Sequence, residues 1–181
     1  MAYTGYYAYE GGNCTPPPAY TFDPCLATEH ARVRAVALLA PGFYFVDPTS
    51  LTEWNNAIAA GNVILLPETR GKFDGGSAKK GEGYGAQKER TLFYDFQLDF
   101  KDLAMYPNAV FYDTIDKVQN WQLAYFTETL LWLVYSPVDI SVKDAVTENI
   151  EDEVVEEVMI TWQSKSHPQK FVKPAGLLPG F

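Results

Sequence analysis

The segment TLFYDFQLDF, residues 91–100, decides the fold class, because apolar and polar side chains alternate along most of its length. In an extended strand, one face carries only apolar residues, namely Leu92, Tyr94, Phe96, Leu98 and Phe100. The opposite face carries three polar residues, Asp95, Gln97 and Asp99. We therefore predict a long strand that turns one face to the core and the other to water or to an interface.

Shorter apolar runs on both sides of this segment predict further strands. We expect them at residues 31–39, 63–66, 121–127, 130–135, 138–142 and 154–162. The first run places Val33, Ala35, Ala37 and Leu39 on one face, with Arg32 and Arg34 opposite. The nearly continuous run LLWLVY at 130–135 is typical of a strand buried on both faces.

Two of these predicted strands are bounded or interrupted by residues that disturb regular pairing. Pro137 follows the LLWLVY run, and we predict a turn there because proline has no backbone N–H to donate to a sheet. Glu156 and Glu157 break the apolar pattern of residues 154–162, which indicates a β-bulge at this point.

Two short helices are expected between the strands. Ser50 and Glu53 have the spacing of a capping box, and Gly61 stands where a glycine ends a helix. The second helix follows Pro107, takes Asn108 as its N-cap and continues to about residue 119. Helices this short are unstable alone, so they must cover a sheet or another helix.

The composition agrees with a β-rich fold. The 181 residues include 12 Tyr, 11 Phe, 13 Gly and 12 Pro, which favour strands and turns over helices. We expect an α+β, mostly β protein, with a β-sandwich or barrel-like core, two short covering helices and extended terminal arms. A single core domain is placed at residues 29–164, between arms at residues 1–28 and 165–181.

The N-terminal arm is rich in tyrosine, glycine and proline and fits no strand or helix period. So many aromatic side chains favour docking, either on the arm's own domain or on a neighbouring subunit. Cys14 and Cys25 in this arm form either a disulfide or two reduced thiols, and the sequence leaves both open. The C-terminal arm carries apolar residues between prolines and glycines, among them Phe171 and Phe181.

Charge is unevenly distributed along the chain. Residues 70–90 contain six Gly and six Lys or Arg, whereas the stretch at 148–157 is acidic. We expect residues 70–90 to form a long exposed loop. It is either a flexible surface loop or a basic projection that contacts an acidic surface, such as 148–157, on another copy.

Motifs that carry catalysis are absent from the sequence, which lacks the G-x-S-x-G, H-E-x-x-H and G-x-x-x-x-G-K-[ST] patterns. The two histidines, His30 and His167, lie far apart, and a metal site needs more Cys or His ligands nearby. We therefore expect no enzymatic activity, no cofactor and no metal. A formal net charge of −9 disfavours nucleic acid as the main partner, and no apolar run is long enough to suggest a membrane partner.

Three segments resemble virion structural proteins of tailed bacteriophages. They are GYGAQKERTLFYDFQLDF (83–100), PNAVFYDTIDKV (107–118) and VMITWQSKSHPQKFVKPAGLL (158–178). The resemblance covers about residues 45–175 and is to ring-forming tail-tube, connector and ring proteins, as in Bacteroidetes and crAss-like phages. It implies β-sandwich or barrel subunits that close into a ring, with loops and arms that clasp neighbouring subunits.

The resemblance also implies a place and partners for the protein. The place is the virion, assembled in the bacterial host cytoplasm. The partners are copies of the chain itself and adjacent phage structural proteins, with DNA at most passing through a lumen. The leading hypothesis is therefore a homo-oligomeric ring subunit of a phage tail or head-tail connector.

This hypothesis places the subunit interface on the arms, the 70–90 segment and the acidic stretch. The expected interface residues are Tyr3, Tyr6, Tyr7, Tyr9, Lys72, Lys79, Lys80, Lys88, Arg90, Glu151, Glu153, Phe171 and Phe181. The alternative is a carbohydrate-binding β-sandwich module, in which Trp and Tyr rings stack on sugars. All four tryptophans fall in elements expected to form the core, which disfavours this alternative: Trp54, Trp121, Trp132 and Trp162.

Overall fold

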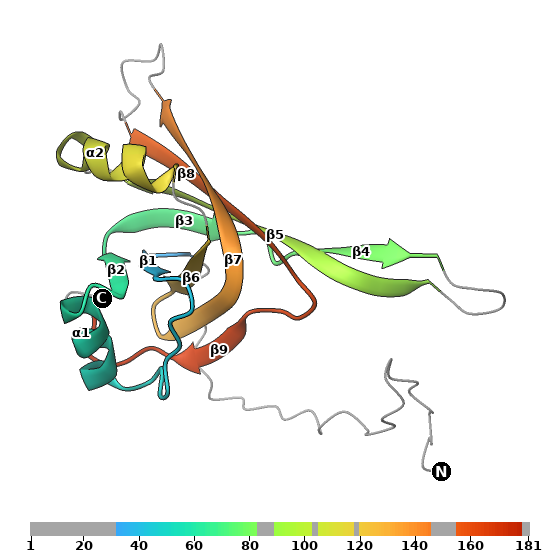
Figure 1. The fold of residues 1–181 in the computed structure, drawn as a ribbon, viewed down its shortest axis with the longest axis horizontal. Helices are drawn as coiled ribbons and strands as arrows, with labels where there is room; N and C mark the ends of the chain where they lie inside the picture. Colours follow the sequence, from blue (N-terminus) through green and yellow to red (C-terminus); the bar gives the residue numbers. More distant parts are fainter. Residues whose placement is uncertain (1–31, 83–88, 103–104, 118–119, 146–154, 179–181) are drawn as a thin grey trace.

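The computed structural model describes residues 32–82, 89–102, 105–117, 120–145 and 155–178, which contain nine strands and two helices (Figure 1). In chain order these are β1 (Ala35–Leu39), α1 (Leu51–Ala59), β2 (Val63–Leu66), β3 (Thr69–Phe73), β4 (Ser77–Gly81), β5 (Arg90–Asp102), α2 (Met105–Ile115), β6 (Trp121–Phe126), β7 (Leu130–Ala145), β8 (Val155–Ser164) and β9 (Gln169–Val172). The prediction of a mostly β domain with two short helices is confirmed.

All nine strands belong to one antiparallel sheet, in the order β2-β1-β6-β7-β8-β5-β3, with β4 added on β5 and β9 on β7. The strand predicted from residues 91–100 is β5. It pairs with β8 along one edge and with β3 and β4 along the other. Its predicted apolar face is buried at Phe96, Leu98 and Phe100.

The sheet closes on itself because β3 also meets the segment that precedes β1. Val33 N donates to Gly71 O at 3.1 Å, and Gly71 N donates to Val33 O at 3.0 Å. β3 therefore lies between β5 and the chain at Val33, which gives a barrel-like core. Gly71 permits this close approach, since a Cβ atom there would lie 2.8 Å from Asp99 O and 2.9 Å from Phe100 Cβ.

Apolar residues form two cores on opposite sides of the sheet. The inner core lies within the barrel and consists of Val33, Val36, Leu38, Leu66, Phe96, Leu98, Phe100, Tyr112, Ile115, Leu123, Tyr125, Val134, Val138, Val158, Ile160 and Trp162. The outer core joins β1 and β6 to α1 and the C-terminal segment through Ala35, Ala37, Leu39, Phe45, Trp54, Ala57, Val63, Ala124, Phe126, Leu131, Leu133, Leu177 and Leu178. β1 is thus buried on both faces. The prediction that residues 33–39 have one apolar and one polar face is wrong, because α1 covers the outer face of β1.

Helix α1 begins and ends as predicted. Ser50 is its N-cap, with Oγ accepting from Glu53 N at 3.4 Å, and Gly61 follows the helix with φ +74°. The Glu53 carboxylate accepts from Val46 N at 2.7 Å and from Asp47 N at 2.8 Å. In a capping box the Glu53 carboxylate would accept from the backbone N–H of the N-cap, Ser50. Here it accepts from residues three and four positions earlier, and so fixes the segment that enters the helix.

Helix α2 packs against the barrel and contributes Tyr112 to the inner core. It begins at Met105, so Asn108 lies inside the helix and its predicted role as N-cap is wrong. Pro107 is tolerated because backbone N–H groups in the first turn have no acceptor within the helix. Just beyond the helix, Asp116 Oδ1 accepts a hydrogen bond from Val142 N at 3.2 Å, which ties this end to β7.

Strand β7 is continuous, so the predicted turn at Pro137 is wrong. Residues up to Val138 pair with β6 and β9, and residues from Asp139 onward pair with β8. The strand changes partners at the proline, where the pairing with β6 also shifts register. A backbone N–H is not required at such a point, so proline is accommodated.

The predicted bulge at Glu156 and Glu157 is also wrong. β8 pairs with β5 in unbroken register, from Asp102 opposite Glu156 to Tyr94 opposite Ser164. Glu156 is only 3% exposed and occupies a core-facing position, which interrupts the apolar pattern without adding a residue.

Residues 70–90 do not form the predicted long loop. Most of them belong to β3, β4 and the start of β5, and residues 83–88 lie outside the described residues. β4, with the sequence SAKKG, has no apolar alternation of its own. It is extended because β5 continues beyond the barrel and offers a strand edge to pair with.

The described part of the predicted C-terminal arm is folded onto the domain. β9 pairs with β7, and Leu177 and Leu178 are buried in the outer core. The predicted N-terminal arm, residues 1–28, lies outside the described residues.

Candidate functional site

The most distinctive feature of the molecule is a hairpin that projects from the barrel, formed by β4 and the first part of β5 (Figure 1). We name residues 77–82 and 89–95 the hairpin arm. Residues 77–80 are exposed, and Leu92 is 44% exposed. Within the described residues, β4 pairs only with β5. A two-stranded ribbon with no apolar layer beneath it is marginally stable by itself.

The root of the hairpin arm is fixed by a tight turn. Asp74 Oδ1 accepts hydrogen bonds from Gly76 N at 2.9 Å and from Gln97 N at 3.2 Å. Gly75 and Gly76 have φ values of +80° and +86°, which residues with a Cβ rarely adopt. The Phe96 ring packs on Gly76, in the space that a Cβ would need. The turn therefore sets the direction of the arm relative to the barrel.

Aromatic rings anchor the base of the arm. The ring centroids of Tyr94 and His167 lie 4.6 Å apart, and those of Phe96 and His167 lie 5.5 Å apart. Phe96 also stacks on Trp162 at 5.3 Å. His167 thus joins the segment after β8 to the arm.

Two of the predicted interface lysines form ion pairs within the chain. Lys79 Nζ lies 3.4 Å from Asp95 Oδ2, and Lys72 Nζ lies 3.5 Å from Asp99 Oδ2. Both lysine side chains are more than half exposed, so each pair contributes only about 0–1 kcal/mol and the lysines can still contact other groups.

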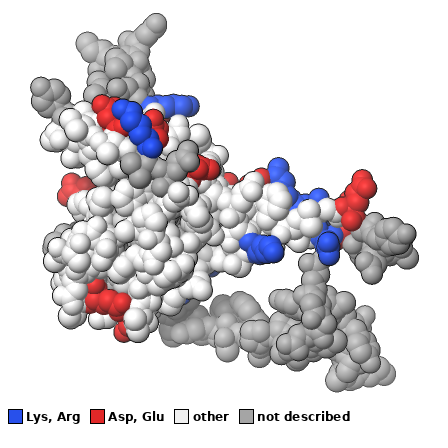
Figure 2. Space-filling view, in the orientation of Figure 1, with Lys and Arg blue, Asp and Glu red and all other residues white. Residues whose placement is uncertain are grey.

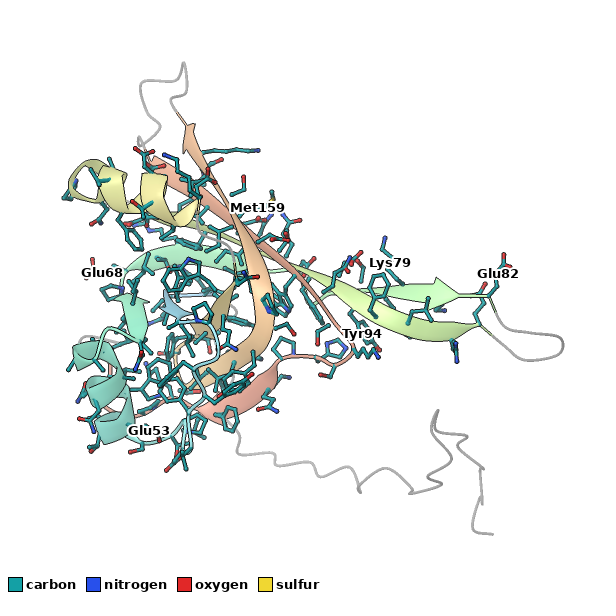
Figure 3. All side chains as sticks on the ribbon, in the orientation of Figure 1. Glu53, Glu68, Lys79, Glu82, Tyr94 and Met159 are labelled. Atoms are coloured by element: carbon teal, nitrogen blue, oxygen red, sulfur yellow. The ribbon has the colours of Figure 1, made fainter. Side chains whose placement is uncertain are left out.

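Charged side chains of both signs line the hairpin arm. Lys80 and Arg90, two further predicted interface residues, are exposed on it, as is Glu82. Figure 2 shows basic groups along the arm and acidic groups toward its end, and Figure 3 labels Lys79 and Glu82 there. The described part of the arm is therefore mixed in charge, not uniformly basic.

The remaining predicted interface residues fall into two groups. Most lie outside the described residues, and their role stays a prediction: Tyr3, Tyr6, Tyr7, Tyr9, Lys88, Glu151, Glu153 and Phe181. Phe171 lies in β9 opposite Leu131 and packs, half-buried, against the outer core. It stabilises the domain from within.

The outward side of β3, β5, β8 and β7 carries a polar surface, of which the alternation of residues 91–100 predicted only the part on β5. Strand register aligns its residues in rows, first Arg70, Lys101, Glu157 and Lys143, then Lys72, Asp99, Met159 and Ser141. The third row contains Gln97, Thr161 and Asp139, and the fourth row, at the base of the hairpin arm, contains Ser77, Asp95 and Gln163. We name these four rows the polar face. Alternation within each strand predicts such a face, but only the register shows which residues share it.

Charge is separated along the polar face. A groove of about 580 Å³ at one end is lined by Arg32, Arg70, Lys72, Lys101 and Lys143, together with Asp99 and Glu157. A groove of about 630 Å³ at the other end is lined by Asp74, Asp95 and Asp139, with no described Lys or Arg among its lining residues. We name these the basic end and the acidic end.

The charges of the polar face differ in how they are paired. Lys101 Nζ lies 2.6 Å from Glu157 Oε1. Lys143 and Asp139 are both exposed, and neither forms an ion pair with another residue in the described part of the chain. These two side chains on β7 are therefore available to an external partner.

A buried polar cluster joins α2 to the barrel. Tyr112 OH donates to Asp102 Oδ2 at 2.5 Å, and Asp102 lies opposite Glu156 in the sheet. Burial raises the pKa of Tyr112, and the hydrogen bond to Asp102 and the nearby carboxylates add to the effect. The phenol therefore stays protonated and remains a donor. Asp102 is 8% and Glu156 3% exposed, so the cluster is enclosed and its role is structural.

The structure offers little to other classes of ligand. Trp54 and Trp162 are buried, while Trp121 and Trp132 are half-buried against the inner core, so no tryptophan presents an open ring to a sugar. Among the described residues, no group of three His, Cys, Asp or Glu could hold a metal ion. No helix within the described ranges has the length and apolar character needed to cross a membrane.

Comparisons of the chain with models of known protein families, with curated proteins and with solved structures found no match.

Proposed function

We propose that the protein is a structural subunit of a homo-oligomeric ring in a phage virion, in a tail or a head-tail connector, and that the hairpin arm contacts the neighbouring copy. The observation that carries this proposal is the arm itself, a ribbon that leaves the barrel with β4 exposed and Leu92 open to solvent. The resemblance of residues 83–100, 107–118 and 158–178 to ring-forming virion proteins supports the virion location.

A rigid projecting arm suits a ring because each copy must meet the next at the same angle for the ring to close. The glycines and Asp74 at the root of the arm hold that angle. A neighbouring surface packed on the arm would supply the layer that the ribbon lacks. The net charge of −9 suits a lumen through which DNA passes without being held.

The proposal is tested by measuring the mass of the full chain in solution by light scattering, over a range of concentrations and at two salt concentrations. We expect a single oligomer whose mass is a fixed whole-number multiple of the single-chain mass. In a shortened variant, Asn-Gly replaces residues 80–92 and joins Lys79 to Phe93, which pair directly in the hairpin. The removed residues are exposed or half-exposed where described, so we expect a folded barrel that no longer assembles.

The control is Val46→Ser, which alters a residue that is 95% exposed and lies outside the arm. It should assemble like the full chain. A full chain that is monomeric at every concentration would contradict the proposal, and so would a shortened variant that assembles normally.

A further inference from the structure

The polar face is not covered by either helix of the described chain. α1 packs on the outer core at β1 and β6. α2 inserts Tyr112 and Ile115 into the inner core, and the turn after it meets β7 through the Asp116 to Val142 hydrogen bond. Among the described residues, a sheet face that carries a basic end and an acidic end thus stands open beside the hairpin arm.

We propose that the polar face is a self-complementary interface, on which the basic end of one copy docks against the acidic end of a second copy. This inference rests on the proposed function and adds a second contact to it: the hairpin arm joins neighbours within the ring, and the polar face joins copies in pairs across a two-fold axis. A free anion would account for the basic end alone. A second copy accounts for both ends, since the complement of each is present on the same chain.

The register of the four strands defines how the two faces would meet. Met159 and Ser141 occupy the second row, midway between the row of Lys143 and the row of Asp139. A two-fold axis across the strands at this row places Lys143 of each copy over Asp139 of the other. The same rotation places Arg70 over Asp74, which follows it by four residues on the same strand edge. Every residue of the second row would meet its own counterpart on this axis: Met159, half-buried, would meet Met159, and Lys72, paired with Asp99 of its own chain, would meet Lys72.

The size of the polar face shows why the hairpin arm is needed as well. Four strands and the three rows that overlap across this axis span about 20 Å by 20 Å, so two copies would bury about 800 Å² in total. Stable specific interfaces bury at least about 1,200 Å². The polar face alone is therefore a weak contact, and assembly also needs the hairpin arm, which closes the ring.

The test uses Lys143→Glu and Asp139→Lys in the full chain, with the mass in solution as the readout. Both residues are exposed and form no ion pair among the described residues, so both variants should fold with an unchanged thermal unfolding temperature. Each change turns two symmetry-related attractions into repulsions. We expect each variant alone to associate at least about tenfold more weakly than the unmodified chain.

Mixing the two variants provides the decisive measurement. In an equimolar mixture, every facing pair at positions 139 and 143 unites opposite charges, so association should return to the level of the unmodified chain. Assembly of both single variants at the original level would overturn the inference, and so would a mixture that stays dissociated. Loss of binding to a short DNA duplex in Lys143→Glu, with assembly unchanged, would also overturn it by identifying the basic end as a polyanion site.

The outcomes separate this inference from the proposed function. If the shortened-arm variant dissociates while both charge reversals assemble normally, the ring subunit stands and the interface lies elsewhere. If the full chain is monomeric under all conditions, both are wrong.

Discussion

Gly71→Ala should open the seam at which the barrel closes. The new Cβ would lie 2.8 Å from Asp99 O and 2.9 Å from Phe100 Cβ, both parts of the β5 framework, and 3.2 Å from Val33 Cβ. These atoms are a backbone oxygen and Cβ atoms, so rotating a side chain cannot relieve the clash with the new Cβ. Because β3 lies between them, β5 and the segment at Val33 must both move away from β3 by several tenths of an ångström.

The expected cost combines overpacking with weakened hydrogen bonds. Overpacking a close contact costs about 1–3 kcal/mol. The two hydrogen bonds between Gly71 and Val33 contribute about 1 kcal/mol each, and both would lengthen. Alanine also lowers the conformational entropy of the unfolded chain, which stabilises the folded state by about 0.4–1 kcal/mol and offsets part of this cost. The net loss is about 1–4 kcal/mol, which lowers the unfolding temperature by about 2–16 °C in a domain of this size.

The assay is thermal unfolding followed by circular dichroism, with Gly81→Ala as the matched control. Gly81 also pairs with β5, but its Cβ would meet only the end of the Leu92 side chain, which is exposed and can rotate. Neither glycine has a positive φ, so backbone strain does not separate the two variants. Unfolding of Gly71→Ala at or above the temperature of the unmodified chain would refute the role of Gly71 in closure.

The helix cap and the buried tyrosines give three further predictions. Ser50→Ala should cost about 0.5–1 kcal/mol in urea unfolding, at the low end for an N-cap because its bond to Glu53 N is 3.4 Å long. Tyr112→Phe should cost about 1–3 kcal/mol by the same measurement, because it removes the buried hydroxyl that donates to Asp102. Burial raises the pKa of Tyr112 and, with the charge of Asp74, of Tyr125. Their contribution to stability is complete below the unfolded pKa of about 10 and is lost as pH rises toward the folded pKa, so phenolate absorbance should show both titrating only with alkaline unfolding.

Local sequence patterns correctly predicted those strands and helices whose own side chains are enough to determine their structure. The alternation of residues 91–100 identified β5, and the spacing of Ser50, Glu53 and Gly61 identified α1. β4 was missed because its sequence carries no pattern and its partner strand alone makes it extended. The prediction of a turn at Pro137 was wrong because proline is excluded only where a strand pairs with the same neighbouring strand along its whole length, whereas β7 changes from β6 to β8 at this point.

The candidate site was harder to predict because it depends on register. Lys72 and Lys79 were identified from a run of positive charge, but each lies on an aspartate of β5 in the same chain. Lys143 and Asp139 stood in no recognisable motif, and β7 places them on the polar face only through its pairing with β8. Lys143 is grouped with cations from β3 and β5 because β7, β8, β5 and β3 are neighbours in the sheet although they are distant in the sequence.

Closure of the barrel also limits how copies can associate. An open sheet can extend into a neighbour by pairing strand edges, but here β3 and the segment before β1 satisfy each other within one chain. The outer edge of β4 carries Lys79 and Lys80, and lysines on an edge strand oppose continued strand pairing. At these two edges, copies should therefore meet through side chains of the hairpin arm and polar face, not by adding strands. Such contacts are screened by salt, so assembly should weaken as ionic strength rises, which backbone pairing would not do.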